Sequence, residues 1–511
     1  MVNVLFVLID DVGKEVFQTW GMGGTGTYGY PSTPTVDALC EGGTVQGVSY
    51  PGGVRFDRHY VEQLCSPTRA AYLTGRYPFR TGIGDIIRQP AGEDEDATTQ
   101  KPLPNSEYTI ARLLKDHGYA TACFGKWHLG NVLNGGRRSP WRAGFDHYVG
   151  NLFNLQNATQ LTIGGTAFRE GFFSWNGWSQ DENRKCRAYH TTYVVDEAIR
   201  WARDHKADDW FIYLPFYACH DAYTNNATQS PVKKNSPPTD LYDTGTWTTA
   251  ADVTQTTTQQ TMHAYRACIE ATDKELGRLI AALYALDDDF WNNTIVIFSS
   301  DNGSAAGTGG TLQNEVHPSL GAYPANHGKD SPYDPGIWSP LVIAGAGVVS
   351  PNRSYSKLTS CVDILPTVAA MLGFAVPDEI NGVDLTVDGV SLEPVLDNTA
   401  PSTAVRPFVY SEWFQPNGER VGLGDEGKTA YEWAIIGGDV AAGGTEGAGR
   451  YKIMLNGASS TLEFYDLIPS GTYDPMEATN LTPAGDTSSL TATQLAAYNA
   501  LYQSRQTLVT T

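Results

Sequence analysis

Four oxygen-bearing side chains follow two apolar segments of the chain, and together they could hold a metal ion. They are Asp10, Asp11, Asp301 and Asn302. The first pair comes directly after the run Val4–Ile9, and the second comes shortly after Thr294–Phe298. Ligands of open α/β sheets bind beyond the carboxyl ends of the strands, and carboxylate and amide oxygens suit Ca²⁺ or Mg²⁺. Each pair alone is equally typical of a turn after a strand, so their agreement in position is what favours a metal site.

A second candidate is the cysteine in the segment Cys65-Ser66-Pro67-Thr68-Arg69. Proline is common in the first turn of a helix, so Cys65 would lie at a helix amino terminus, where free amides favour an anion. Arg69 would lie one turn along, near the same end. A free cysteine is also commonly a small buried hydrophobic residue, so the residue types alone leave both interpretations open.

These segments resemble the motifs of the type I sulfatases of the arylsulfatase kind, in the alkaline phosphatase superfamily, and the resemblance spans nearly the whole chain. The most specific match is Cys65-Ser66-Pro67-Thr68-Arg69 followed by Leu73-Thr74-Gly75-Arg76. The others, in chain order, are Gly125-Lys126-Trp127-His128-Leu129-Gly130, Gly144-Phe145-Asp146-His147, residues 211–216 with His220, Phe298–Gly303, Gly328-Lys329-Asp330-Ser331, Val362–Thr367, Asp388–Leu392, Glu463–Leu467 and Asp474–Glu477. The resemblance implies hydrolysis of sulfate monoesters, of the aryl sulfate type, to an alcohol or phenol and inorganic sulfate.

The resemblance also implies roles for individual residues. In this family the cysteine of Cys-x-Pro-x-Arg is converted to formylglycine, so Cys65 would become the nucleophile after a maturation enzyme has acted on it. The expected metal ligands are Asp10, Asp11, Cys65, Asp301 and Asn302, with Ca²⁺ as the ion and Mg²⁺ or Mn²⁺ as alternatives. The expected catalytic residues are Cys65, Arg69, Lys126, His128, His220 and Lys329. Among them Arg69 would contact the nucleophile, His128 would act as a base, and His220 or Lys329 would act on the leaving oxygen.

Charge explains why such a set suits this reaction. A sulfate monoester carries one negative charge spread over three oxygens, and its sulfur resists attack until that charge is neutralised. A divalent cation, two lysines and a histidine supply the neutralisation in preorganised form. Hydrated formylglycine offers one hydroxyl for attack and a second through which sulfate can be released. Lys126 and His128 lie two residues apart, so on an extended segment they would face the same side.

The chain departs from the family at two places. Where the family usually has Glu-Gly-Gly-x-Arg, this chain has Asp334-Pro335-Gly336-Ile337-Trp338, so a tryptophan replaces the arginine. The loop that carries Lys329 also contains two prolines, which predicts a different approach to the site. After His220, Ala222 stands where the family often has proline, which predicts an unusual rim around the leaving group.

Two other functions fit parts of the pattern. A phosphonate monoester or phosphodiester hydrolase would use the same formylglycine and metal site, and matched aryl substrates would distinguish it. A metal-dependent carbohydrate-binding protein would use the 12 Trp and 27 Tyr as stacking surfaces. It would bind its ligand without turnover and keep Cys65 unmodified.

The elements that must position these residues alternate between short apolar strands and amphipathic helices, the pattern of a mostly parallel α/β sheet flanked by helices. Strands are predicted at Val4–Ile9, Trp210–Phe216, Thr294–Phe298 and Leu341–Ala344, and helices at Thr109–His117, around Val195–Ala202 and at Tyr265–Leu283. After a linker at Asn398–Pro407 the strands become short. They are predicted at Phe408–Trp413, Tyr431–Ile436, Tyr451–Leu455 and Leu462–Asp466. We therefore expect a catalytic domain over residues 1–400 and a small carboxyl-terminal α+β subdomain over residues 401–511.

Composition limits the partners and the compartment. The 511 residues carry 35 Lys and Arg against 56 Asp and Glu, a net charge of −21, which disfavours nucleic acid and anionic membranes as partners. No apolar run reaches the length of a membrane-spanning helix. The seven cysteines show no framework spacing and the amino terminus is a poor signal peptide, so we expect a cytoplasmic protein, or a periplasmic one if a leader was removed. A homo-oligomer is an open alternative to a monomer.

Overall fold

The computed structural model describes residues 2–21, 30–88, 101–153, 189–220, 237–242, 258–304, 327–380, 382–418, 430–438, 447, 449–457, 461–469, 473–474 and 477–510. For residues 160–163, 166–169, 171–177, 180–186 and 258–264 it gives the backbone path alone. Ala222, at which the sequence departs from the family, lies outside the described residues.

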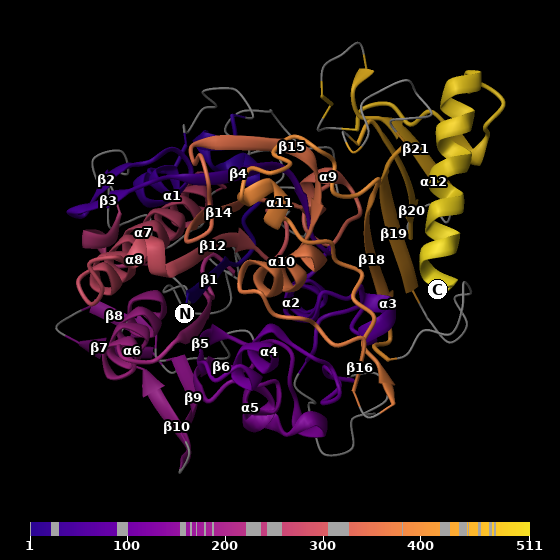
Figure 1. Ribbon diagram of the computed structural model, residues 1–511. Coiled ribbons are helices and arrows are strands. Elements are labelled where there is room, and N and C mark those ends of the chain that lie inside the picture. The colour runs from indigo at the N-terminus through magenta and orange to yellow at the C-terminus, as the bar shows by residue number, and fades with distance from the viewer. Residues whose placement is uncertain are drawn as a thin grey trace.

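Within this part of the chain, one eleven-stranded sheet forms the centre of the molecule (Figure 1). The strand order is β10-β9-β6-β5-β11-β1-β12-β14-β4-β13, and β15 pairs with β4. The bounds are β1 Asn3–Ile9, β4 Gly53–Tyr60, β5 Ala120–Lys126, β6 His147–Asn151, β9 Gly171–Gly177, β10 Gln180–Cys186, β11 Trp210–Pro215, β12 Thr294–Ser300, β13 Trp338–Ser339, β14 Leu341–Gly345 and β15 Arg353–Ser360. The central strands β6, β5, β11, β1 and β12 are parallel, which confirms the predicted α/β fold. Antiparallel pairs flank them, and β14, which continues the predicted alternation, runs antiparallel to β12.

Helices cover both faces of this sheet because its central strands are apolar on both sides. Along β1, Phe6 packs into one core with side chains of α2, α4 and α10, while Val7 packs into a second core with α1, α6 and α7. These helices are α1 Pro34–Glu41, α2 Cys65–Thr74, α4 Ile110–Asp116, α6 His190–Asp204, α7 Thr258–Tyr284 and α10 Ile364–Met371. The predicted helices correspond to α4, α6 and α7; α6 and α7 begin earlier than predicted, at His190 and Thr258.

The register of the central strands brings their carboxyl ends to one edge. Ile9, the last residue of β1, is paired with Ser300, the last residue of β12. On its other side, β1 pairs Leu8 with Pro215, the last residue of β11. The polar residues that follow β1, β11 and β12 therefore start from neighbouring positions, and Lys126 ends β5, the next strand of the same parallel set.

The carboxyl-terminal residues form a second, antiparallel sheet of four strands in the described part (Figure 1). Its strands are β18 Val409–Gln415, β19 Ala430–Gly437, β20 Tyr451–Asn456 and β21 Thr461–Asp466, each within two residues of its predicted bounds. The helix α12, Ala492–Thr510, packs on β19 and β20 and was not predicted. The buried ammonium group of Lys452 links this sheet to the larger unit, since it lies 3.0 Å from Asp334 and 2.6 Å from Glu477. The proposed boundary near residue 400 stays a prediction.

The remaining helices and strands are short. They are β2 Gly43–Val45, β3 Val48–Tyr50, β7 Gln160–Ile163, β8 Thr166–Arg169, β16 Glu379–Ile380, β17 Val383–Asp384, α3 Pro78–Thr81, α5 Ser139–Arg142, α8 Phe290–Asn293, α9 Asp334–Ile337 and α11 Glu393–Leu396. Among the described helices, none combines the length and the apolar character needed to span a membrane.

Candidate active site

The two turns predicted to bind a metal lie side by side at the carboxyl edge of the sheet. The backbone amide of Asp11 donates to Asp301 Oδ1 at 3.2 Å. The side-chain amide of Asn302 donates to Asp11 Oδ1 at 2.8 Å. Asp10, Asp11, Asp301 and Asn302 are all fully buried. The structure thus brings the four predicted oxygen donors into one cluster.

The turn after β1 is unusual because Asp11 has φ = 61°, in the left-handed region. A non-glycine residue there costs roughly 1–3 kcal/mol, so surrounding contacts must hold it. The Tyr265 hydroxyl donates to the Asp11 carbonyl at 2.7 Å, and the next amide, of Val12, donates to Ser300 Oγ at 3.3 Å. The turn allows Asp10 and Asp11 to face the same site, which two successive residues of a straight strand cannot do.

Cys65 is the first residue of α2, as predicted, and its sulfur lies at the centre of the polar cluster. The lysine ammonium groups of Lys126 and Lys329 approach Sγ to 3.4 and 3.5 Å. The thiol in turn points at Asn302 Oδ1, 3.4 Å away, and at Asp10 Oδ1, 3.8 Å away. Sγ therefore occupies the position from which a converted side chain at residue 65 would present its oxygen atoms.

Arg69 lies one turn further along α2, also as predicted, but its guanidinium group is turned to the acids. It donates to Asp301 Oδ2 from Nε at 3.0 Å and from Nη2 at 2.7 Å, and Nη2 also reaches Asp10 Oδ2 at 2.9 Å. Its Nη1 donates to the Lys126 carbonyl at 2.6 Å. The expected contact between Arg69 and the nucleophile is not among these bonds. Arg69 instead holds two carboxylates in place, because a fork of donors matches that geometry.

Lys126 and His128 both reach the site, but not by the route that the sequence predicts. Lys126 is the last residue of β5, and its Nζ lies 2.7 Å from Asp10 Oδ2. His128 has φ = 57°, so the segment is not extended there, and the prediction that Lys126 and His128 face the same side of an extended segment was wrong. A left-handed turn places the residue instead, and the Ser66 hydroxyl fixes it by donating to the His128 carbonyl at 2.7 Å.

Lys329 enters the site in spite of the altered loop around it. Its Nζ lies 2.6 Å from Asp11 Oδ1, and its side chain is only 11% exposed. The Lys329 amide donates to the Ser304 carbonyl at 3.0 Å, which ties the loop to the turn after β12. The prolines of this loop therefore do not keep the lysine away from Cys65.

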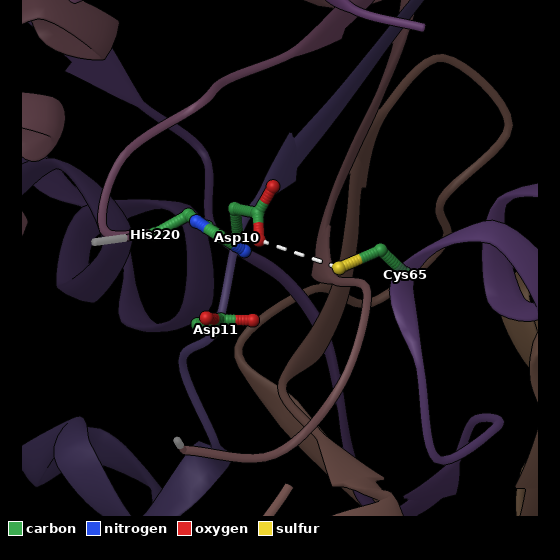
Figure 2. A group of neighbouring side chains, drawn as sticks. All are labelled: Asp10, Asp11, Cys65 and His220. Atoms are coloured by element: carbon green, nitrogen blue, oxygen red, sulfur yellow. Dashed lines mark hydrogen bonds between the residues drawn. The ribbon is translucent and has the colours of Figure 1, made fainter. Parts of the chain in front are cut away.

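His220 lies beside the two aspartates that follow β1 (Figure 2). One ligand atom each from Asp10, Asp11, Cys65 and His220 can be chosen so that all four lie within 4.8 Å of one another. The Tyr217 hydroxyl lies 3.3 Å from His220 Nδ1 and orients the ring. Asp301 is outside this group of four. Arg69 and the Asp11 amide contact its oxygens, and its role as a metal ligand stays a prediction.

The donor set fits a divalent cation. The four ligand atoms that lie within 4.8 Å of one another, from Asp10, Asp11, Cys65 and His220, are close enough to surround one ion. Asp10 Oδ1 and Asn302 Oδ1 both point to Cys65, so they already converge on one place. Within the described residues, carboxylate and amide oxygens dominate this donor set, as a hard cation prefers.

Burial and neighbouring charges shift the pKa values of the site. Burial, followed by the charge of Asp301, raises the pKa of Asp10 to about 6. Burial acts the same way on Asp11, but Lys329, His220 and Lys126 outweigh it and lower the pKa of Asp11 below its usual value. Burial and the nearby Lys126 and Arg69 lower the pKa of His128 well below 6.5, so its imidazole is neutral near pH 7.

Two residues of the site carried no assigned role in the sequence. Ser66 connects α2 to His128. Tyr217 orients His220, and the Lys126 ammonium group lies 5.6 Å from the centre of the Tyr217 ring. Tyr217 stands just beyond the apolar run of β11, so nothing in the pattern distinguishes it from a core aromatic residue. Ser66 lies inside the Cys-Ser-Pro-Thr-Arg segment, which was the available signal.

Comparisons with known proteins place the chain in a family. The family model described as "Sulfatase" matches residues 2–374. Steryl-sulfatase of Mus musculus is 27% identical over 464 residues, covering 78% of this chain and 65% of the relative, so the chain spans just under two thirds of that protein. Arylsulfatase A of Homo sapiens is 27% identical over 433 residues, covering 80% of this chain and 71% of the relative.

Solved structures share the fold. PsFucS1, a sulfatase from Pseudoalteromonas sp., superimposes with a TM-score of 0.59 at 21% identity, covering 89% of this chain and 78% of that one. BT4656, solved in complex with its substrate D-glucosamine-2-N,6-O-disulfate, gives a TM-score of 0.64 at 18% identity, covering 99% and 97%. The family model covers well over half of the chain, and it matches the part that contains every residue of the site. The chain therefore belongs to the sulfatase family.

Proposed function

We propose that this protein hydrolyses sulfate monoesters, of the aryl sulfate type, with formylglycine at position 65 and Ca²⁺ as its metal ion. The observation that carries the proposal is the convergence on Cys65 Sγ of two ammonium groups and two side-chain oxygens, all within 3.8 Å. The relatives named above are all sulfatases, so they give no support to the phosphonate alternative.

The cation would be held by Asp10, Asp11 and Asn302, with Asp301 and residue 65 completing the set. When bound, it would supply positive charge to the sulfate oxygens and to the nucleophilic oxygen. Ca²⁺ suits the oxygen-rich donors, and its flexible coordination number suits a site in which ligands come from separate segments. Formylglycine, once hydrated, would supply a hydroxyl nucleophile that a cysteine thiol does not offer.

The two lysines would bind the sulfate group. Lys126 and Lys329 approach Sγ from positions that also contact Asp10 and Asp11, so their ammonium groups lie between the acids and the reacting atom. Burial strengthens their effect, because the side chains are 0% and 11% exposed and a low local dielectric screens charge weakly. They would stabilise the sulfuryl oxygens during transfer.

The two histidines would move protons. The Nδ1 atom of His128 is buried and has no hydrogen-bond partner among the described residues, and its low pKa keeps it unprotonated. It is therefore placed to accept a proton, here from the converted side chain at residue 65. His220, whose Nδ1 contacts Tyr217, would deliver a proton to the leaving alcohol or phenol oxygen.

The proposal also requires a partner and a compartment. A formylglycine-generating enzyme must act on Cys65 while the segment is still accessible, since the cysteine is 1% exposed in the folded protein. The six cysteines of the described residues are buried and form no disulfide with one another, which supports the cytoplasm, with the periplasm as the alternative.

Steady-state kinetics on matched substrates test the function. The protein should cleave 4-nitrophenyl sulfate with a higher kcat/KM than a 4-nitrophenyl phosphonate monoester, lose turnover on chelation, and regain it with Ca²⁺ better than with Zn²⁺. Cys65→Ala should be inactive, while Cys40→Ala, which alters another buried free cysteine on α1, should keep its activity. Faster cleavage of the phosphonate, or full activity after chelation, would contradict the proposal.

A further inference from the structure

One buried acid beside the active site has none of the roles described above. Glu15 follows the turn after β1 and is fully buried. Its carboxylate accepts one hydrogen bond from the Ser304 hydroxyl and a second from Trp338 Nε1 at 2.7 Å. Trp338 is the tryptophan that stands where the family usually has arginine. The hydrogen bond to Glu15 therefore involves a residue at which this chain departs from the family.

Ser304 connects three segments that carry site residues. Its hydroxyl accepts a hydrogen bond from the Gly13 amide at 3.0 Å, two residues after Asp11. Ser304 itself follows Asn302 by two residues, and its carbonyl accepts a hydrogen bond from the Lys329 amide at 3.0 Å. A displacement of Ser304 would therefore move the turn after β1, the turn after β12 and the segment of Lys329 relative to one another.

The packing around these bonds leaves little room for rearrangement. A Cβ atom at Gly13 would lie 2.1 Å from a carboxylate oxygen of Glu15. A Cβ atom at Gly303 would lie 1.8 Å from the Pro335 carbonyl oxygen. The Lys14 ammonium group lies over the indole ring of Trp338, 4.7 Å from its centre. Both turns are therefore closely packed, and the hydrogen bond from Ser304 to Glu15 joins them.

We propose that Glu15 is a positioning residue, which through Ser304 and Trp338 holds the two metal-binding turns and the Lys329 segment in the geometry that binds the divalent cation. This inference rests on the proposed function for the metal site itself. Partners beyond the direct ligands commonly change metal affinity 10- to 100-fold when they are removed. A purely structural role would instead lower stability and leave the affinity of the folded protein unchanged.

Calorimetric titration of the metal-free, full-length protein with Ca²⁺ separates these outcomes. Glu15→Gln keeps the shape of the side chain but turns an amide toward one of the two donors, so the Kd for Ca²⁺ should rise about ten-fold or more. Ser304→Ala and Trp338→Phe each remove one of the bonds and should raise the Kd in the same direction. Glu15→Gln combined with Ser304→Ala should raise it by less than the product of the single effects.

The matched control is Asp273→Asn. Asp273 is also a buried carboxylate that accepts two hydrogen bonds, from the amides of Thr35 and Val36 at 3.0 and 2.9 Å. Neither partner belongs to the site, so this variant should lose stability while keeping the Kd for Ca²⁺ within two-fold or so of wild type. Asp273→Asn thus measures how much the Kd for Ca²⁺ changes when a buried acid outside the site is replaced by an amide.

The possible results are distinct. An unchanged Kd in folded Glu15→Gln, Ser304→Ala and Trp338→Phe would overturn the positioning role, and so would an equal rise in Asp273→Asn. Failure of the wild-type protein to bind Ca²⁺ would contradict the proposed metal site instead. If Glu15→Gln does not fold, the Kd values of Ser304→Ala and Trp338→Phe determine whether the positioning role holds.

Discussion

The two lysines beside Cys65 allow a quantitative test, because they lie at nearly equal distances from the sulfur but differ in exposure. Nζ of Lys126 is 3.4 Å from Sγ on a fully buried side chain, and Nζ of Lys329 is 3.5 Å away on a side chain that is 11% exposed. Replacement by methionine removes the charge of either residue and keeps most of the side-chain volume. We expect Lys126→Met to lose more activity than Lys329→Met.

The magnitude follows from Coulomb's law. Two unit charges about 4 Å apart interact by about 4 kcal/mol at an effective dielectric constant of roughly 20, and by about 1 kcal/mol in bulk water. A sulfate group bound at residue 65 would lie at about that distance from Lys126, so kcat/KM should fall by about 10³-fold in Lys126→Met. Water near Lys329 screens its charge, which predicts a loss nearer 10- to 100-fold.

The Lys126→Met variant should remain folded, because Arg69 still contacts Asp10 at 2.9 Å and leaves the acid partnered. The assay is kcat and KM for 4-nitrophenyl sulfate, with inhibition by inorganic sulfate as a measure of ground-state binding. Lys115→Met is the control, since Lys115 pairs with Asp146 at the surface on α4, outside the site, and should change kcat/KM less than two-fold or so. A larger loss in Lys329→Met than in Lys126→Met would refute the electrostatic reasoning.

Three further results are expected. Peptide mass spectrometry of active protein should show residue 65 lighter than cysteine by about 18 Da, the change from thiol-bearing carbon to formyl group, and an intact thiol alone would contradict the nucleophile. His220→Ala should lose about 10²–10⁴-fold on alkyl sulfates and less on activated phenyl sulfates, because good leaving groups need little protonation; equal losses across a leaving-group series would exclude this role. Burial raises the pKa of Asp273 from 3.8 to about 7, so the folded state keeps a proton that the unfolded chain releases. Stability should therefore fall as pH rises from about 4 to about 7, and urea midpoints should show a weaker fall in Asp273→Asn; parallel curves would refute the shift.

The strands of the central sheet were predictable because burial on both faces requires continuous apolar runs. β1, β11 and β12 each lie within two residues of the predicted bounds. The helix α12 was missed because its buried side chains, Ala497, Leu501, Arg505 and Val509, form a narrow stripe that includes an arginine. Such a stripe lacks the broad apolar face by which an amphipathic helix is recognised.

The site residues also differ in how far the sequence predicts them. Asp10 and Asp301 were predictable from position, since Asp10 directly follows one predicted buried strand and Asp301 comes shortly after another. His128 and Lys329 depend on turns whose backbone geometry is set by tertiary contacts, so the residues could be named from motifs but their route to the site could not. Glu15 carried no signal, because a single acid near a turn is usually solvated, and its burial against Trp338 is a property of the folded chain alone.

The arrangement of charges in the site connects metal binding to sulfate binding. Three acids, Asp10, Asp11 and Asp301, face three cations, Arg69, Lys126 and Lys329, so the formal charges of these six groups balance. The lysines neutralise the same carboxylates that are proposed to hold Ca²⁺. A bound divalent cation would leave an excess of positive charge around residue 65.

That excess predicts a reciprocal effect between the two ligands. Ca²⁺ should tighten the binding of inorganic sulfate, and sulfate should tighten the binding of Ca²⁺ by the same factor, because coupling free energies are symmetric. We expect a factor of about 5–150, the usual range for such coupling. Calorimetric titrations of Ca²⁺ with and without saturating sulfate measure one side, and titrations of sulfate at two Ca²⁺ concentrations measure the other. Bound Ca²⁺ would neutralise the carboxylates and leave the lysine ammonium groups available to sulfate. Lys126→Met removes one of these ammonium groups, so the coupling should weaken in that variant. Independent binding of Ca²⁺ and sulfate in the wild-type protein would show that the lysines stay with their carboxylates, and that the sulfate group is neutralised by some other part of the site.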